Sequence, residues 1–170
     1  LHKIMNRPYF GIWLASAQGH PGRFKYMTQC IDSMVDNGDP RLTKDLRILE
    51  IGAYAGGSAI VWCQALKKHD IANGKVISID PWDSYPAISG GGHRLHFRIM
   101  NHNLGNGNVL RLFVRNLKAA GVSDVCYQFR GRSEDILPLL DGQKFDVIYI
   151  DGNHHVNAIS KDLEGSLPLL

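Results

Sequence analysis

Residues 48–60, which read ILEIGAYAGGSAI, decide the fold of this protein. An apolar run that contains Glu50 leads into a turn with three glycines, and further apolar residues follow Ser58. A glycine-rich turn between a strand and a helix is typical of a nucleotide site, because glycines let the backbone approach the ligand. The stretch therefore predicts a strand, a ligand-binding turn and a helix, in that order.

Short apolar runs that predict strands recur along the chain, at residues 47–53, 75–80, 125–131 and 145–151. Helical patterns lie between and after them, at residues 58–70, 109–121, 133–142 and 154–170. Strands that alternate with helices form right-handed crossovers and a parallel sheet covered on both faces. The expected fold class is therefore α/β, a doubly wound parallel sheet with helices on both faces.

The sequence divides into an N-terminal helical accessory segment, residues 1–46, and a core, residues 47–170. Apolar residues at helical spacing predict a helix over residues 22–38 of the accessory segment: Phe24, Met27, Ile31, Met34 and Val35. The core stops after a helix, where another strand should begin, and the chain starts with Leu1 rather than Met. We therefore expect sequence beyond both ends and a C-terminally truncated domain.

An insertion at residues 82–107 is rich in Gly, Asn and His. A segment of this length without regular structure is usually a functional lid or a disordered loop. We expect it to contribute to an acceptor site, with its aromatic residues lining a lid: Trp82, Tyr85 and Phe97. A metal site at His93, His96 and His102 is the less favoured alternative, since solvated loop histidines are far more common.

Composition and charge are those of an ordinary globular domain of 170 residues, 44% of them hydrophobic. The net charge of +3 is small and the basic residues are scattered, which argues against a nucleic-acid partner. No apolar run is long enough to span a bilayer. Three well-separated cysteines, Cys30, Cys63 and Cys126, are expected to be buried free thiols. We expect a cytoplasmic protein with no membrane partner; whether it forms a homo-oligomer is left open.

Two common nucleotide motifs do not match the turn. The dinucleotide fingerprint, G-x-G-x-x-G, needs a second glycine where Tyr54 stands, and this side chain would obstruct a pyrophosphate. The phosphate loop, G-x-x-x-x-G-K-[ST], has the spacing of Gly52 and Gly57, but Ser58 replaces its lysine. A ligand bound through phosphates is therefore not favoured.

The remaining pattern, E-x-G-x-x-x-G-x-S, favours a cationic or zwitterionic ligand, and S-adenosylmethionine has this character. Glu50 is suited to its ammonium group, and the turn backbone with the Ser58 hydroxyl is suited to its carboxylate. Asp80 ends the second predicted strand, where a carboxylate accepts hydrogen bonds from a ribose. The alternative is that the turn needs glycines for its shape alone and that Asp80 is a solvated residue before Pro81.

Four motifs in order resemble those of class I S-adenosylmethionine-dependent methyltransferases. They are EIGAYAGGSAIVWC (50–63), VISIDPW (76–82), GRSEDILPLL (131–140) and FDVIYIDGNHH (145–155). The resemblance is greatest to the catechol-type and other small-molecule O-methyltransferases, in the broad branch of methyltransferase family 24. It implies a Rossmann-like fold, S-adenosylmethionine as cofactor and methyl transfer to a hydroxyl of a small-molecule acceptor.

The resemblance also implies a role for each matching residue. Those that would hold the methionine part of the cofactor are Glu50, Gly52, Tyr54, Gly56 and Ser58. Asp80 would bind the ribose. Ser133 and Glu134 would border the adenine, with Gly131 and Arg132 supplying backbone groups.

Asp151 and His154 are the candidate catalytic residues. Asp151 ends the fourth predicted strand and should point into the crevice beside the cofactor. The resemblance makes Asp151 the first metal ligand and puts His154 where the family has the lysine that takes the acceptor's proton. Mg²⁺ would activate a bound hydroxyl, and a histidine can act as a base near neutral pH. One carboxylate does not make a magnesium site, and His154 is as well suited to a hydrogen bond at a helix start, so dependence on Mg²⁺ stays open.

Two other functions are compatible with these motifs. A relative with the same fold could run metal-dependent hydroxylase or hydrolase chemistry near Asp151. A binding domain could keep the cofactor pocket without turnover. Product analysis separates the three, because only a methyltransferase adds one methyl mass to an acceptor.

Overall fold

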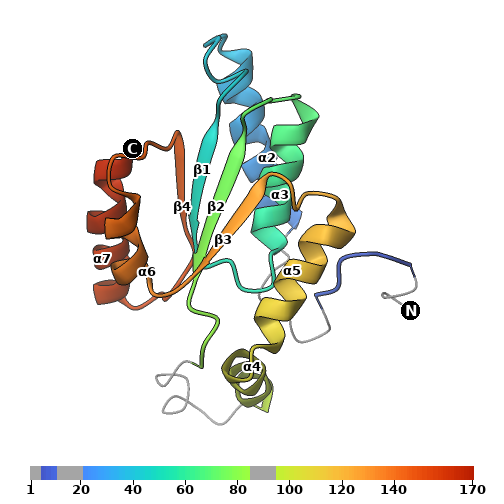
Figure 1. Cartoon of the computed structure of the whole chain (residues 1–170), viewed down its shortest axis with the longest axis vertical. Helices are drawn as coiled ribbons and strands as arrows, with labels where there is room; N and C mark the ends of the chain where they lie inside the picture. Colours follow the sequence, from blue (N-terminus) through green and yellow to red (C-terminus); the bar gives the residue numbers. More distant parts are fainter. Residues whose placement is uncertain (1–4, 11–20, 85–94) are drawn as a thin grey trace.

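A parallel β-sheet forms the centre of the structure (Figure 1). The computed structural model describes residues 5–10, 21–84 and 95–170. The strands are β1 (Arg47–Ile51), β2 (Lys75–Asp80), β3 (Cys126–Arg130) and β4 (Val147–Ile150), in the order β3-β2-β1-β4. The four predicted strands are confirmed, each within the residues that the sequence assigned to it.

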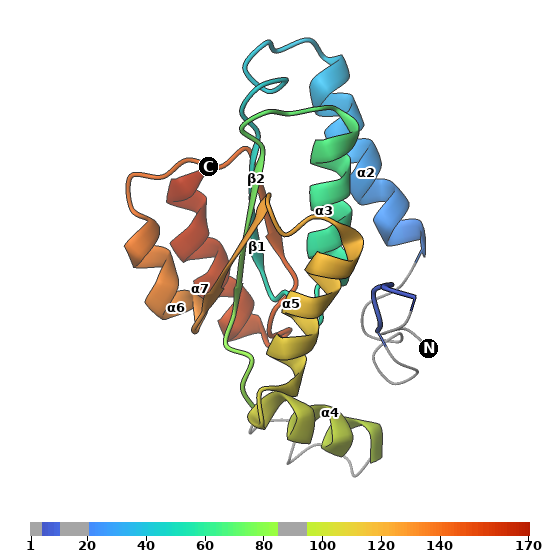
Figure 2. The ribbon, with the colours of Figure 1, turned by 45° about the vertical axis from the view of Figure 1, so that its right-hand side comes forward.

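Helices cover both faces of the sheet, as Figures 1 and 2 show. On one side lie α3 (Gly57–Lys68) and α5 (Asn108–Ala120), with α2 (Pro21–Asp36) packed against α3. On the other side lie α6 (Ser133–Ile136) and α7 (Val156–Ser166). The doubly wound α/β fold is therefore confirmed, as is the helix predicted over residues 22–38.

The two helices on the second face are shorter than the sequence predicts. Each is followed by a short 3₁₀ helix: Leu137–Leu140 after α6 and Leu167–Leu169 after α7. Pro138 and Pro168 lie in these segments and have no backbone N–H, so the α-helical hydrogen-bond pattern cannot continue through them. The tighter 3₁₀ geometry takes over at those points.

The central strand β1 sends alternate side chains to opposite faces of the sheet. Ile48 belongs to the core beneath α3, whereas Leu49 and Ile51 belong to the core beneath α6 and α7. All three are at most 4% exposed. A strand that is buried on both faces reads as a continuous apolar run, which explains why ILEI lacks the alternation of a half-buried strand.

Helix α2 is fastened to α3 by both apolar and polar contacts. Met27 and Ile31 are buried in the core that α3 shares. Asp32 accepts hydrogen bonds from Lys68 and His69 at the end of α3, both at 2.7 Å. Helix α2 is thus packed against the core of the sheet domain.

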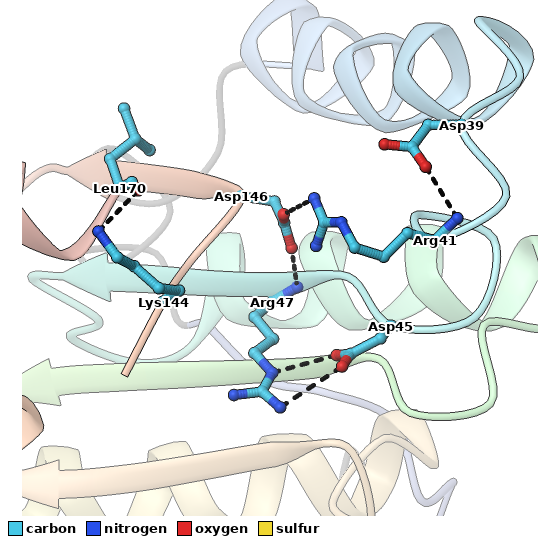
Figure 3. Close-up of polar contacts among 7 residues, drawn as sticks. All are labelled: Asp39, Arg41, Asp45, Arg47, Lys144, Asp146 and Leu170. Carbon is cyan, nitrogen blue, oxygen red and sulfur yellow. Dashed lines mark hydrogen bonds and ion pairs between the residues drawn. The ribbon is translucent and has the colours of Figure 1, made fainter. Parts of the chain in front are cut away.

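Charged side chains fasten the amino ends of β1 and β4 to each other (Figure 3). Asp146 accepts a hydrogen bond from Nη2 of Arg41 at 2.6 Å and another from the backbone N–H of Arg47 at 2.8 Å. The Arg47 guanidinium pairs with Asp45 at 3.1 Å. These contacts hold the two strands side by side at the edge of the sheet opposite the Gly52 turn.

The segment predicted as an irregular insertion contains a helix, α4 (Leu95–Gly105). Trp82 was expected to line a lid, and this prediction is wrong: its side chain is fully buried and its ring centroid lies 4.9 Å from that of Phe113. Its ring N–H donates to the Tyr54 carbonyl at 2.6 Å. An indole has a large apolar surface and one hydrogen-bond donor. In the core, the surface packs against Phe113 and the donor has an acceptor in the Tyr54 carbonyl. The expectations for Tyr85, His93, and the side chains of His96 and Phe97 lie outside the described residues.

The three cysteines are free thiols. Cys63 and Cys126 are buried as expected, but Cys30 is only half-buried, because it lies on α2 near the surface. Within the described ranges, no helix combines the length and the hydropathy needed to cross a membrane.

Candidate functional site: a crevice at the carboxyl ends of β1 and β4

The turn after β1 touches the end of β4. Because the chain runs from β1 to β2 and β3 on one side and places β4 on the other, the carboxyl ends of β1 and β4 flank a topological switch point, where open α/β sheets bind ligands. Gly52 has φ +94°, and a Cβ there would lie 2.6 Å from Cα of Gly152. Only glycine fits this close approach of two backbones.

A cavity of about 630 Å³ opens at this edge of the sheet. It is lined by four of the residues predicted to bind the cofactor: Gly52, Gly131, Ser133 and Glu134. Residues after β2, β4 and in α7 complete its wall, among them Pro81, Asn153 and Asp162. Motifs that are distant in the sequence therefore meet around one cavity.

The other predicted cofactor residues, which do not line this cavity, are Glu50, Tyr54, Gly56, Ser58 and Asp80. Glu50 is fully buried, and its Oε2 accepts a hydrogen bond from the Ser78 hydroxyl at 2.6 Å. Burial raises the pKa of Glu50 to about 7, although the hydroxyls of Ser58 and Ser78 oppose the rise. Oε1 is buried without a hydrogen-bond partner among the described residues. Burial of this kind disfavours the charged form of the carboxyl group.

Asp80 fixes the shape of the turn. Its two carboxylate oxygens accept hydrogen bonds from the backbone N–H groups of Tyr54, at 2.8 Å, and Trp82, at 2.7 Å. Burial raises the pKa of Asp80 above its usual value, while these backbone donors act in the opposite direction. Tyr54 has φ +46°, which is strained for a non-glycine residue, and Asp80 helps hold it there.

Asp162 is a site residue that the sequence analysis missed. It lies on α7, is only 5% exposed, and accepts a short hydrogen bond from the Ser133 hydroxyl. Burial raises its pKa, and Glu134 adds to the rise. One signal was available: Ala158, Asp162 and Ser166 recur at i, i+4 and i+8, a stripe that faces inward on a helix.

Asp151 and His154 lie close together at the end of β4. Oδ1 of Asp151 is 3.8 Å from Nε2 of His154, whose side chain is 78% exposed. Oδ2 of Asp151 accepts hydrogen bonds from Nη1 of Arg23, at 2.8 Å, and from the Tyr149 hydroxyl, at 3.2 Å. Arg23 comes from α2, and nothing in the sequence pattern indicated that it would reach this edge of the sheet.

A family model of a methyltransferase domain matches residues 49–170. The chain belongs to this family. The match begins inside β1 and includes the turn, Asp80, the segment after β3, Asp151 and His154. The methyltransferase domain therefore carries every residue that the sequence predicted for the site, whereas Arg23 precedes the matched region.

Solved structures share the fold of this methyltransferase domain at low sequence identity. The O-methyltransferase TomG from Streptomyces achromogenes, in complex with SAM, is 22% identical with a TM-score of 0.58, over 99% of this chain and 56% of that chain. The O-methyltransferase NovP is 22% identical with a TM-score of 0.64, over 86% and 60%. The O-methyltransferase from Bacillus cereus, in complex with SAH, is 18% identical with a TM-score of 0.57, over 99% and 57%.

A curated relative is the uncharacterized protein y4gI of Sinorhizobium fredii. It is 24% identical over 124 residues, which are 73% of this chain and 12% of that protein. The chain thus spans somewhat more than half the length of the solved structures and a small part of this relative.

Proposed function

We propose that this methyltransferase domain belongs to an enzyme that transfers a methyl group from S-adenosylmethionine to an oxygen of a small-molecule acceptor. One observation carries the proposal: the glycine turn after β1 and the segment that begins at Gly131 border the same cavity at the switch point, beside Asp151. O-methyltransferases with this fold have been solved with SAM or SAH bound, which supports the same cofactor here.

The residues of the cavity wall and those in and beneath the neighbouring turn are together suited to S-adenosylmethionine. Gly52 keeps side-chain atoms away from the point where the turn meets β4, and the unpartnered Oε1 of Glu50 is suited to the ammonium group. Asp80 would accept from the ribose with its remaining lone pairs. Ser133 and Glu134 would border the adenine. The turn at Tyr54, Gly56 and Ser58 would enclose the methionine part of the cofactor.

Bound S-adenosylmethionine supplies an electrophilic methyl group on a sulfonium sulfur. The imidazole of His154 would take the proton of the acceptor hydroxyl, so that this oxygen can accept the methyl group that the cofactor would supply. Asp151, 3.8 Å from Nε2 of that ring, would stabilise the imidazolium that forms. The exposed position of His154 leaves it accessible to an acceptor.

The described residues do not fit a Mg²⁺ site. No group of three or more His, Cys, Asp or Glu side chains within the described ranges could hold a metal ion. Asp151 is the residue expected to bind the metal, and its Oδ2 is already paired with Arg23. The proposed proton transfer therefore uses His154 and no metal ion.

Product analysis tests the reaction. The full-length protein is incubated with methyl-labelled S-adenosylmethionine and a panel of hydroxylated small molecules, and the products are weighed by mass spectrometry. We expect a gain of one labelled methyl group on an oxygen. Any other mass change would favour different chemistry on the same fold, and cofactor binding without product across the panel would favour a binding domain.

We also propose a cytoplasmic location for the protein. Its three cysteines are free thiols, whereas the cysteines of secreted proteins usually form disulfides. The free thiols therefore support this location. Cell fractionation with a tagged full-length protein would test it.

A further inference from the structure

Arg23 connects the N-terminal helix α2 to the end of β4. Its Nη1 lies 2.8 Å from Oδ2 of Asp151, and the two side chains are 30% and 21% exposed. We propose that Arg23 is the cation paired with Asp151 in this protein. Its guanidinium then occupies the carboxylate at which the resemblance predicted a divalent metal ion.

Helix α2 holds Arg23 in this position. Met27 and Ile31, one and two turns further along the helix, are buried against α3. Asp32 is fastened to the end of α3 through Lys68 and His69. The guanidinium therefore comes from a helix that is already packed in place. Forming the ion pair then costs less conformational entropy than it would for an arginine on a free segment.

Oδ2 of Asp151 has little capacity left for a metal ion. Oδ2 already accepts from Arg23 and from the Tyr149 hydroxyl. An arginine side chain stays protonated at any pH at which proteins fold, so a divalent cation at Asp151 would have to displace or tolerate a fixed positive charge. Mg²⁺ and Mn²⁺ favour carboxylates whose charge is not already neutralised.

Arg23 acts on the site as a positioning residue. The pair fixes Oδ2, which leaves Oδ1 as the oxygen nearest to His154. The Nε of Arg23 is buried and has no hydrogen-bond partner among the described residues. The guanidinium therefore keeps one donor that its contact with Asp151 does not use. The catalytic meaning of this arrangement rests on the proposed function, but the exclusion of a metal ion from Asp151 does not.

Mn²⁺ binding to the full-length protein tests the proposal without cofactor, acceptor or turnover. The probe is Mn²⁺ alone, followed through the electron paramagnetic resonance signal of the free ion. We expect wild type and Asp151→Asn to bind Mn²⁺ equally, within about twofold, because Arg23 already occupies the carboxylate. Binding that is weakened about tenfold or more by Asp151→Asn would overturn the proposal, since Asp151 would then be a metal ligand.

Variants of Arg23 supply the converse test. Arg23→Gln should bind Mn²⁺ roughly fivefold more tightly than wild type or better, because it frees the carboxylate, whereas Arg23→Lys should not. An affinity of Arg23→Gln within about twofold of wild type would contradict the proposal. Arg41→Gln is the matched control: it removes an arginine from an aspartate pair at the opposite edge of the sheet and should leave Mn²⁺ binding unchanged. If Arg23→Gln does not fold, the comparison of wild type with Asp151→Asn still decides.

Discussion

The Ser78 hydroxyl donates a hydrogen bond to Glu50 across two neighbouring strands, with 2.6 Å between the hydroxyl oxygen and Oε2. The two residues are register partners of β2 and β1, and both are fully buried. A carboxylate removed from water is more costly in its charged form, and burial accordingly raises the pKa of Glu50 to about 7. The protonation state of Glu50 should therefore change when a charged group binds in the turn above it.

Glu50→Gln should change how stability depends on pH. The raised pKa means that the folded state keeps a proton which the unfolded chain loses above its ordinary pKa of 4.5. Wild type should therefore lose stability as the pH rises from 4.5 to about 7. Relative to Glu50→Gln, the loss should approach ~3 kcal/mol between about pH 5 and about pH 8, measured by urea unfolding. The exposed Glu164→Gln should show no such trend, and parallel pH curves for wild type and Glu50→Gln would contradict the account.

Cofactor binding should release a proton from Glu50. If the ammonium group of S-adenosylmethionine binds at Oε1, it favours the charged carboxylate and lowers the pKa of Glu50. Calorimetry near pH 7 in buffers of different ionisation enthalpy should then show the release of up to about half a proton per site, since a group with a pKa of about 7 is half protonated at that pH. The same experiment on Glu50→Gln should show a smaller release. Equal values for the two proteins would mean that the ammonium group binds elsewhere.

Gly52→Ala should be far more damaging than Gly38→Ala. Both glycines have positive φ, +94° and +82°, but a Cβ at Gly38 would meet nothing within 4 Å, whereas at Gly52 it would collide with the backbone at the end of β4. We expect Gly38→Ala to cost about 1 kcal/mol of stability through backbone strain alone. Gly52→Ala should cost roughly 3 kcal/mol or more and abolish cofactor binding. Equal losses in thermal unfolding would show that the contact between the turn and β4 is unimportant.

Asp162→Ala should weaken cofactor binding, although Asp162 would lie away from the methyl group that is transferred. The carboxylate holds the Ser133 hydroxyl at the cavity wall, and its removal leaves Ser133 free to rotate. We expect about a tenfold loss of affinity for S-adenosylhomocysteine by calorimetry, because the residues that border the adenine are no longer held in place. Glu164→Ala, an exposed change on the same helix, should leave the affinity unaltered.

Much of the fold could be predicted from the sequence because its signals are local. The apolar run at β1, the glycines after it and the acid that ends β2 define a strand, a turn and a switch point within a few residues of each other. The closeness of Gly52 to Asp151 followed from topology, since parallel strands bring their carboxyl ends to one edge.

The parts that could not be predicted depend on partners distant in the sequence. Trp82 follows a strand and precedes a glycine-rich stretch, which is typical of a loop, yet the Phe113 ring on α5 gives it a place in the core. Arg23 and Asp151 are 128 positions apart in the sequence, and no sequence feature near either residue indicates that the two pair. The full burial of Glu50 and its hydrogen bond with Ser78 of the neighbouring strand were not predicted either.

The central claim is that the cavity at the carboxyl ends of β1 and β4 binds S-adenosylmethionine. Calorimetric titration of the full-length protein with S-adenosylhomocysteine tests it most directly, since this product needs no acceptor. We expect one site with a dissociation constant of about 10 µM or tighter. Asp80→Asn should bind at least about tenfold more weakly, because the substitution weakens the hydrogen bonds that hold the turn. Absence of binding by the folded wild-type protein, or equal binding by Asp80→Asn, would contradict it.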